Sequence, residues 1–182
     1  RLFALDKNGS NVKSLGQRPS FYDTQLRQFD GAILDWLPRE GNAVLMSRVY
    51  VPEGGAASRV LRTEEGLGVD RIDLTTLETT SIEESDPTVS SFLSDGRGKV
   101  RIKEARRIRA GSQLASKIDY FYRRTGSSDW ELFSSYDTST REGLIPIAID
   151  ADIDSVYALK KLDGRFALYR VKLDGSMATE LA

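Results

Sequence analysis

Neither cysteine nor histidine occurs among the 182 residues of this chain. Without cysteine there is no disulfide, no thiolate nucleophile and no cysteine-ligated zinc. Without histidine the general base of a serine–histidine–aspartate triad is missing, so such a triad cannot form within the chain. The absence of cysteine is compatible with reducing and oxidising compartments alike, and it leaves the location of the protein open.

Long apolar runs and an excess of one charge are lacking as well. No apolar stretch approaches the length of a membrane span, and no signal peptide is visible. The formal net charge is −1, whereas a dedicated nucleic-acid binder normally carries a basic field. We therefore expect neither a nucleic acid nor a membrane as partner. Hydrophobic residues make up 40% of the chain, which is enough for the core of one domain, 1–182.

Short apolar runs separated by polar turns are present instead, most clearly over 145–182. The runs are Ile145–Ile149, Val156–Leu159, Phe166–Val171 and Met177–Leu181, and the turns are Asp150–Asp154, Asp163-Gly164 and Asp174-Gly175. Asp-Gly between two β-prone runs is a strong hairpin signal, because a type I′ turn needs positive φ at both central residues. This stretch therefore predicts a four-stranded antiparallel sheet.

The same pattern recurs at a spacing of 56 residues. The shift aligns Leu37 with Leu93 and Ile149, Val44 with Val100 and Val156, and Met46 with Ile102 and Ala158. A second hairpin has apolar residues ten positions apart and occurs four times: Leu5 and Leu15, Ile72 and Ile82, Tyr122 and Leu132, Val171 and Leu181. One such unit cannot bury its apolar faces alone, so neighbouring units must stack on it.

The repeats predict an all-β fold, namely a partial β-propeller of about three and a half four-stranded antiparallel blades. We expect blades at 31–84, 89–135 and 145–182, and the outer hairpin of a further blade at 1–16. Since the chain opens inside a strand and without methionine, we expect it to be a fragment of a longer protein. A β-sandwich is the alternative, but it gives no reason for a gapless 56-residue shift.

Two connections and one charged strand lie outside this simple pattern. The connection 17–30 carries the apolar residues Phe21, Tyr22, Leu26 and Phe29, and we expect its aromatic side chains to cover a sheet edge. The connection 51–68 is rich in glycine, and we interpret it as a surface loop rather than a functional one.

Basic residues alternate with apolar ones over Lys99–Lys103 and continue at Arg106, Arg107 and Arg109. A face that binds phosphates is one interpretation. We prefer a half-exposed strand with a solvated face, since no aromatic side chains interleave to stack bases.

Short motifs yield no catalytic, cofactor-binding or metal-binding residue, and no cofactor is expected. Ser10–Lys13 matches Ser-x-x-Lys on a hairpin turn, without the partner motifs of that class. Asp150–Asp154 begins like a calcium loop, but Ser155 replaces the glycine and Lys161 the glutamate that such a loop needs.

A sugar-active propeller enzyme with paired carboxylates is a weaker alternative. Its acids would be Asp35, Asp95 and Asp150. All three lie on or next to first-hairpin turns, where ordinary turn chemistry already predicts aspartate.

Six stretches resemble a known family when their order and spacing are taken together. They are Ile33–Pro38, Arg48–Pro52, Glu65–Arg71, Phe92–Gly98, Tyr120–Arg123 and Leu159–Arg165. In this combination they resemble the N-terminal propeller region of bacterial prolyl oligopeptidase family serine peptidases. The resemblance covers essentially the whole chain, although no single stretch is diagnostic.

This resemblance implies a parent serine peptidase in which an α/β-hydrolase domain, C-terminal to this chain, carries the catalytic residues. The propeller would cap that domain and restrict the access of peptide substrates, without being catalytic itself. None of the family's catalytic residues matches a position here. The parent would reside in the bacterial periplasm or cytoplasm.

The alternative is a stand-alone TolB-like propeller that binds other proteins. Three and a half blades would leave open sheet edges and uncovered blade faces, so we also expect the isolated chain to self-associate, for example as two copies in a ring.

Overall fold

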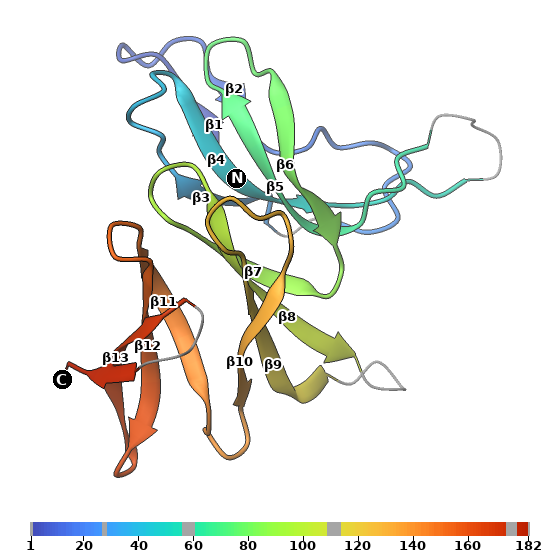
Figure 1. Ribbon diagram of the computed structural model, residues 1–182. Coiled ribbons are helices and arrows are strands. Elements are labelled where there is room, and N and C mark those ends of the chain that lie inside the picture. The colour runs from blue at the N-terminus through green and yellow to red at the C-terminus, as the bar shows by residue number, and fades with distance from the viewer. Residues whose placement is uncertain (1, 27–28, 56–60, 109–113, 174–177, 182) are drawn as a thin grey trace. The chain divides into compact units, whose positions relative to one another are not determined.

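The structure is a computed structural model that describes residues 2–26, 29–55, 61–108, 114–173 and 178–181. All regular elements in these residues are β-strands, and none of the described segments is a helix that could cross a membrane. The strands form one two-stranded and three four-stranded antiparallel sheets (Figure 1). The predicted all-β fold is thereby confirmed, and the four-stranded sheets fit the blades of a partial propeller.

Each sheet is built from strands that are consecutive in the chain, which is the order of an antiparallel meander. The small sheet pairs β1 (Phe3–Ala4) with β2 (Lys13–Ser14). Sheet A contains β3 (Gly31–Asp35), β4 (Ala43–Tyr50), β5 (Gly66–Asp73) and β6 (Thr79–Asp86). Sheet B contains β7 (Val89–Ser94), β8 (Val100–Ile108), β9 (Leu114–Tyr122) and β10 (Glu131–Asp137). Sheet C contains β11 (Leu144–Asp150), β12 (Ser155–Leu162), β13 (Arg165–Lys172) and β14 (Ala178–Glu180).

The chain divides into two compact units, Arg1–Pro87 and Thr88–Ala182. In the first unit, Leu15 of the N-terminal hairpin packs on sheet A against Val44, Met46 and Ile72. In the second unit, buried side chains of sheets B and C form one core, which includes Ile102, Tyr120, Tyr122, Val156, Ala158 and Val171. Each four-stranded sheet is thus stabilised by an apolar face that a neighbouring element of the same unit covers.

Burial follows the 56-residue shift closely in the second strand of each sheet. Val44, Val100 and Val156 are 3% exposed or less, and Met46, Ile102 and Ala158 are 1% exposed or less. The alignment is looser in the first strand, because Leu37 lies beyond the end of β3, whereas Leu93 and Ile149 lie within β7 and β11.

The second hairpin shows a consistent difference between its two aligned positions. In the three four-stranded sheets, the first residue of each pair is buried and the second is exposed. The buried residues are Ile72, Tyr122 and Val171, and the exposed ones are Ile82, Leu132 and Leu181. The N-terminal hairpin reverses this order, with Leu5 exposed and Leu15 buried.

The tight turn at Asp163-Gly164 has the geometry that the sequence predicted. Asp163 has a φ of 48° and Gly164 a φ of 81°, so both central residues have positive φ. The flanking residues Leu162 and Arg165 pair across the hairpin. The similar pair Asp174-Gly175 lies outside the described residues.

Two expectations about side chains are wrong. The aromatic residues of the 17–30 connection do not cover a sheet edge, since Phe21 is 97% and Phe29 68% exposed. The Lys99–Lys103 strand does not have a solvated basic face, because Arg101 is buried. The Lys103 ammonium lies 5.1 Å from the centroid of the Trp130 ring and 5.7 Å from that of Phe121. Both faces of this strand are therefore in contact with other side chains, which the alternation alone did not reveal.

Candidate functional site

The three aspartates proposed for a sugar-active site stabilise turns in this structure. Asp35 Oδ1 accepts the backbone N–H of Leu37 at 3.2 Å. Asp95 Oδ1 accepts the N–H of Arg97 at 2.9 Å. Asp150 Oδ1 accepts the N–H of Asp152 at 3.1 Å. These contacts are those of ordinary Asx-turns.

The acids of the calcium-like loop are engaged with arginines of sheet B. Arg97 Nη2 lies 2.5 Å from Asp152, and Arg101 Nη2 lies 2.7 Å from Asp154. Across the described residues, no group of three or more acidic side chains is arranged to hold a metal ion.

The Ser-x-x-Lys match does not bring its two side chains together. Ser10 Oγ donates to Asn8 Oδ1 at 2.7 Å, whereas Lys13 Nζ donates to the carbonyl of Thr75 at 2.5 Å. Each side chain therefore has a local structural role.

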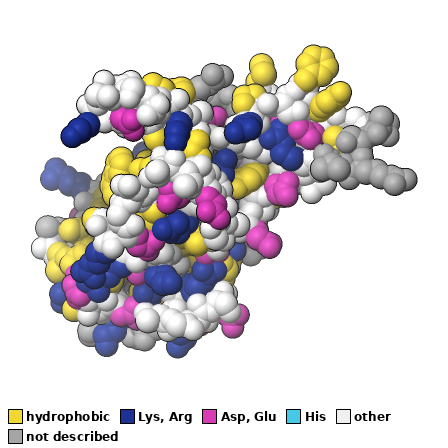
Figure 2. Space-filling view, turned by 90° about the horizontal axis from the view of Figure 1, so that it is seen from above, with side chains coloured by type: hydrophobic (Ala, Val, Ile, Leu, Met, Phe, Trp, Pro, Cys, Tyr) yellow, Lys and Arg dark blue, Asp and Glu magenta, His cyan; other side chains and the backbone are white. Residues whose placement is uncertain are grey.

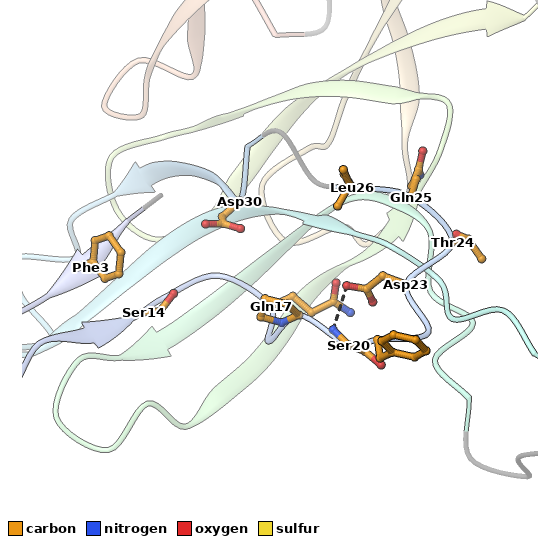
Figure 3. Close-up of a pocket in the computed structure, with 11 residues that line it drawn as sticks. Phe3, Ser14, Gln17, Ser20, Asp23, Thr24, Gln25, Leu26 and Asp30 are labelled. Carbon is orange, nitrogen blue, oxygen red and sulfur yellow. Dashed lines mark hydrogen bonds between the residues drawn. The ribbon is translucent and has the colours of Figure 1, made fainter.

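In the first unit, the segment 16–30, of which the structure describes residues 16–26 and 29–30, has two ends that meet, and we call these described residues the Ω-loop. A Cβ atom on Gly16 would lie 2.6 Å from Cγ of Asp30, so only glycine allows this approach. The loop encloses a pocket of about 650 Å³ together with Phe3 and Ser14 of the N-terminal hairpin (Figure 3). Figure 3 also shows the hydrogen bond from the Ser20 N–H to Asp23, which measures 3.0 Å.

Arg62 holds the Ω-loop in place from outside. Its Nη2 lies 2.5 Å from Asp23 and 3.1 Å from Glu53, and its Nη1 donates to the carbonyl of Arg18 at 2.8 Å. The Ser20 hydroxyl and the backbone N–H of Arg62 hold the pKa of Glu53 below its ordinary value. One guanidinium therefore ties the loop to the chain that follows β4.

The apolar side chains of the Ω-loop point outward. Phe21, Tyr22, Leu26 and Phe29 are all more than half exposed. Hydrophobic side chains on the molecular surface are visible in Figure 2, next to charged side chains of both signs. Apolar side chains gathered on a surface loop make this loop a candidate for contact with another protein.

A second pocket of the first unit is acidic. It has a volume of about 720 Å³ and is lined by Glu64, Glu65, Glu83 and Glu84, with Tyr50 and Ser81 among its neutral residues. Such a pocket concentrates negative potential and would favour a cationic group over an anionic one.

Behind Tyr50, sheet A buries a charged pair. Asp70 is 1% exposed, and its Oδ2 lies 2.6 Å from Arg48 Nη1 and accepts the Tyr50 hydroxyl. Burial, and next the hydrogen bond to Asp70, raise the pKa of Tyr50 above its ordinary value. Asp70 Oδ1 and Arg48 Nε are buried and have no hydrogen-bond partner among the residues that the structure describes. These two atoms have lost hydration without a replacement hydrogen bond, which adds to the desolvation cost of the pair.

Neither the Arg62 contacts nor the acidic pocket could be inferred from the sequence patterns. Two adjacent glutamate pairs, 64–65 and 83–84, were the available signal for the pocket, but only the pairing of β5 with β6 brings them together. No such signal marks Arg62.

Comparison with known proteins gives no identification. No protein-family model matches the chain, and no curated protein matches it.

Proposed function

We propose that this chain is the non-catalytic propeller portion of a prolyl oligopeptidase-like serine peptidase. It would gate the access of peptides to a hydrolase domain that lies C-terminal to it. The observation that carries the proposal is the succession of four-stranded antiparallel sheets, which fit propeller blades, combined with the six family-like stretches. The chain contributes no histidine to a triad, so the chemistry is assigned to the other domain.

Gating by a propeller requires that its blades stay together, so that a substrate cannot enter between them. Within the second unit, the contacts that would serve this purpose are the shared core of sheets B and C and the Arg101–Asp154 ion pair. Loosening these contacts should admit longer peptides while leaving the chemistry of the hydrolase domain unchanged.

The first test is to sequence the full-length gene product on the C-terminal side of Ala182. A Gly-x-Ser-x-Gly segment and a late histidine would support the peptidase, and labelling of that serine by a fluorophosphonate would establish it. A product without a nucleophile elbow would overturn the proposal.

The gating role is tested on the full-length protein with a short and a long peptide that share the cleaved bond. Arg101→Gln should raise kcat/KM for the long peptide relative to the short one. Arg97→Gln, which removes the exposed neighbouring pair, is the matched control and should leave this ratio unchanged. Equal ratios in both variants would argue against gating.

A TolB-like binding module is the second candidate, and the outward-facing apolar side chains of the Ω-loop favour it. In that case Phe21→Ser and Leu26→Ser should abolish binding to a purified partner without changing the stability of the chain. The isolated chain is proposed to self-associate in either case, which light scattering over a range of concentrations would test.

A further inference from the structure

The exposed side of sheet C carries a small pocket of about 220 Å³. It is lined by five residues from β12, β13, β14 and the turn before β12: Ile153, Ser155, Arg170, Lys172 and Thr179. None of them belongs to the Ω-loop or to the acidic pocket.

Strand register explains why the polar side chains converge there. Arg170 and Lys172 are two positions apart on β13, so they project from the same face of the sheet. Ser155 lies directly opposite Lys172, and Thr179 lies directly opposite Arg170. Opposite residues of an antiparallel pair have Cβ atoms about 5 Å apart, so the four side chains surround one point.

The two cations of this pocket have no acidic partner within the described residues. Seven other arginines of the described chain form ion pairs: Arg48, Arg62, Arg71, Arg97, Arg101, Arg106 and Arg124. For Arg170 and Lys172, no ion pair or hydrogen bond is formed by the side chain within the described residues. Two like charges on one face repel each other, and an anion between them would remove that cost.

Nearby acids are committed elsewhere. Asp152 and Asp154 of the preceding turn pair with arginines of sheet B. Asp150 pairs with Ser155 from β11, so it lies on the same face of the sheet but two strands away from Lys172, where its Oδ2 accepts the Tyr157 hydroxyl at 3.3 Å. The pocket therefore lacks an internal counter-charge among the described residues.

We propose that this pocket binds a small oxyanion of the phosphate class. Arg170 and Lys172 supply the charge, and the Thr179 hydroxyl supplies a hydrogen bond. Two cations favour a dianion over a single carboxylate, and a guanidinium can donate two parallel hydrogen bonds to phosphate oxygens. Ser155, whose hydroxyl donates to the carbonyl of Ile153 at 3.1 Å, forms the wall of the site. This inference does not rest on the proposed function.

The test is a titration of the full chain with inorganic phosphate at constant ionic strength, monitored by amide NMR shifts. We expect saturable shifts centred on β13 and β14. The double variant R170Q/K172Q should weaken binding at least about tenfold, since it removes two charge-assisted contacts. Because both side chains project to the surface, the variant should keep its fold, which a thermal melt checks.

The matched control is R165Q/K160Q, which removes an arginine and a lysine of the same hairpin that do not line the pocket. It should bind phosphate like the original chain. Shifts spread over basic residues throughout the chain, or equal weakening by both double variants, would overturn the proposal. The phosphate group could belong to a phosphate ester or to free phosphate, and a titration with glycerol phosphate distinguishes the two. Binding as tight as that of inorganic phosphate indicates a site for phosphate esters, and weaker binding indicates a site for the free ion.

Discussion

Arg101 of β8 reaches the turn before β12, where its Nη2 lies 2.7 Å from Oδ1 of Asp154. Its side chain is 6% exposed, and its Nε also donates to the carbonyl of Arg123 at 2.8 Å. Arg97 makes a similar contact with Asp152 of the same turn, but there both side chains are largely exposed. Two ion pairs thus link sheet B to the turn before β12 at different degrees of burial.

Replacing each arginine separates the effect of burial from that of charge. Arg101→Gln should lower the free energy of unfolding by about 2–3 kcal/mol, because it removes a buried cation and leaves a carbonyl without its donor. Arg97→Gln should change it by less than about 1 kcal/mol, as for other exposed pairs. Urea unfolding measures both values. Similar losses in the two variants would show that burial of Arg101 is not stabilising the contact.

Alanine substitutions at two glycines separate the stability cost of an unfavourable backbone conformation from the cost of a steric clash. A Cβ on Gly164 would meet no atom within 4 Å, so Gly164→Ala should cost about 1 kcal/mol for the positive φ alone. A Cβ on Gly31 would lie 1.8 Å from the carbonyl oxygen of Ser47. Gly31→Ala should therefore cost several times more, because β3 must move away from β4. Thermal melts would compare the two, and equal costs would contradict the close approach of these strands.

The fold was predictable because turns and apolar positions recur at a fixed period. Asp163-Gly164 specifies its turn locally, and Val44, Val100 and Val156 mark the same buried position in three sheets. Burial of Arg101 was not predictable, since an alternating strand has the same sequence pattern whether its polar face is solvated or packed against a neighbour.

The same limit applies to the 17–30 connection. Its aromatic residues suggested packing on a sheet, but the loop is held by Arg62, which lies far away in the sequence. Contacts of this kind depend on which strands lie together, and no local pattern records them. The acidic pocket and the unpaired Arg170 and Lys172 arise in the same way, from the register of neighbouring strands.

Stability toward acid should depend on two turns of the same pattern, Asp-x-(Ser/Thr)-Thr-x-Glu, at 73–78 and 137–142. The backbone N–H groups of Thr76 and Thr75 lower the pKa of Asp73, and the hydroxyl and N–H of Ser139 lower that of Asp137. Because folding lowers each pKa, the stabilisation is complete above the unfolded value of about 4 and is lost as the pH falls through the folded-state value.

Asp73→Asn and Asp137→Asn should therefore be less stable than the original chain near neutral pH. The difference should shrink toward zero as the pH falls below about 4. Urea unfolding at a series of pH values measures this difference. A gap between variant and original chain that stays constant with pH would show that the carboxylate charge has no part in the turn.

Loss of stability in alkali should involve two tyrosines, one in each unit. Burial raises the pKa of Tyr50 and of Tyr120 well above the ordinary value of about 10. Since folding raises the pKa, the stabilisation is complete below about pH 10 and is lost as the pH rises through the folded-state value. In an ultraviolet titration of the folded chain, these two should ionise late, and Tyr50→Phe and Tyr120→Phe should each remove one late step. An unchanged titration in either variant would contradict the burial of that hydroxyl.

The Ω-loop should lose its order when Arg62 is changed, although the sheets should not. Arg62→Lys keeps the charge but cannot reach Asp23, Glu53 and the Arg18 carbonyl at once, because an ammonium lacks the forked geometry of a guanidinium. The amides that tie the loop to its neighbour are Thr24 N–H, which donates to Pro52 at 3.0 Å, and Gly54 N–H, which donates to Tyr22 at 2.8 Å. Hydrogen exchange at these two amides should accelerate at least about tenfold, while exchange in β4 and β5 stays unchanged.

Arg71→Lys is the control for this experiment, since Arg71 forms a single ion pair of 2.8 Å with Glu40 at a partly exposed position of the same unit. It should leave the exchange of both loop amides unaltered. If Arg62→Lys also leaves them unaltered, the loop is held by its backbone contacts alone. If instead it accelerates exchange throughout sheet A, then Arg62 stabilises the whole unit, and the Ω-loop and the sheet open together rather than separately.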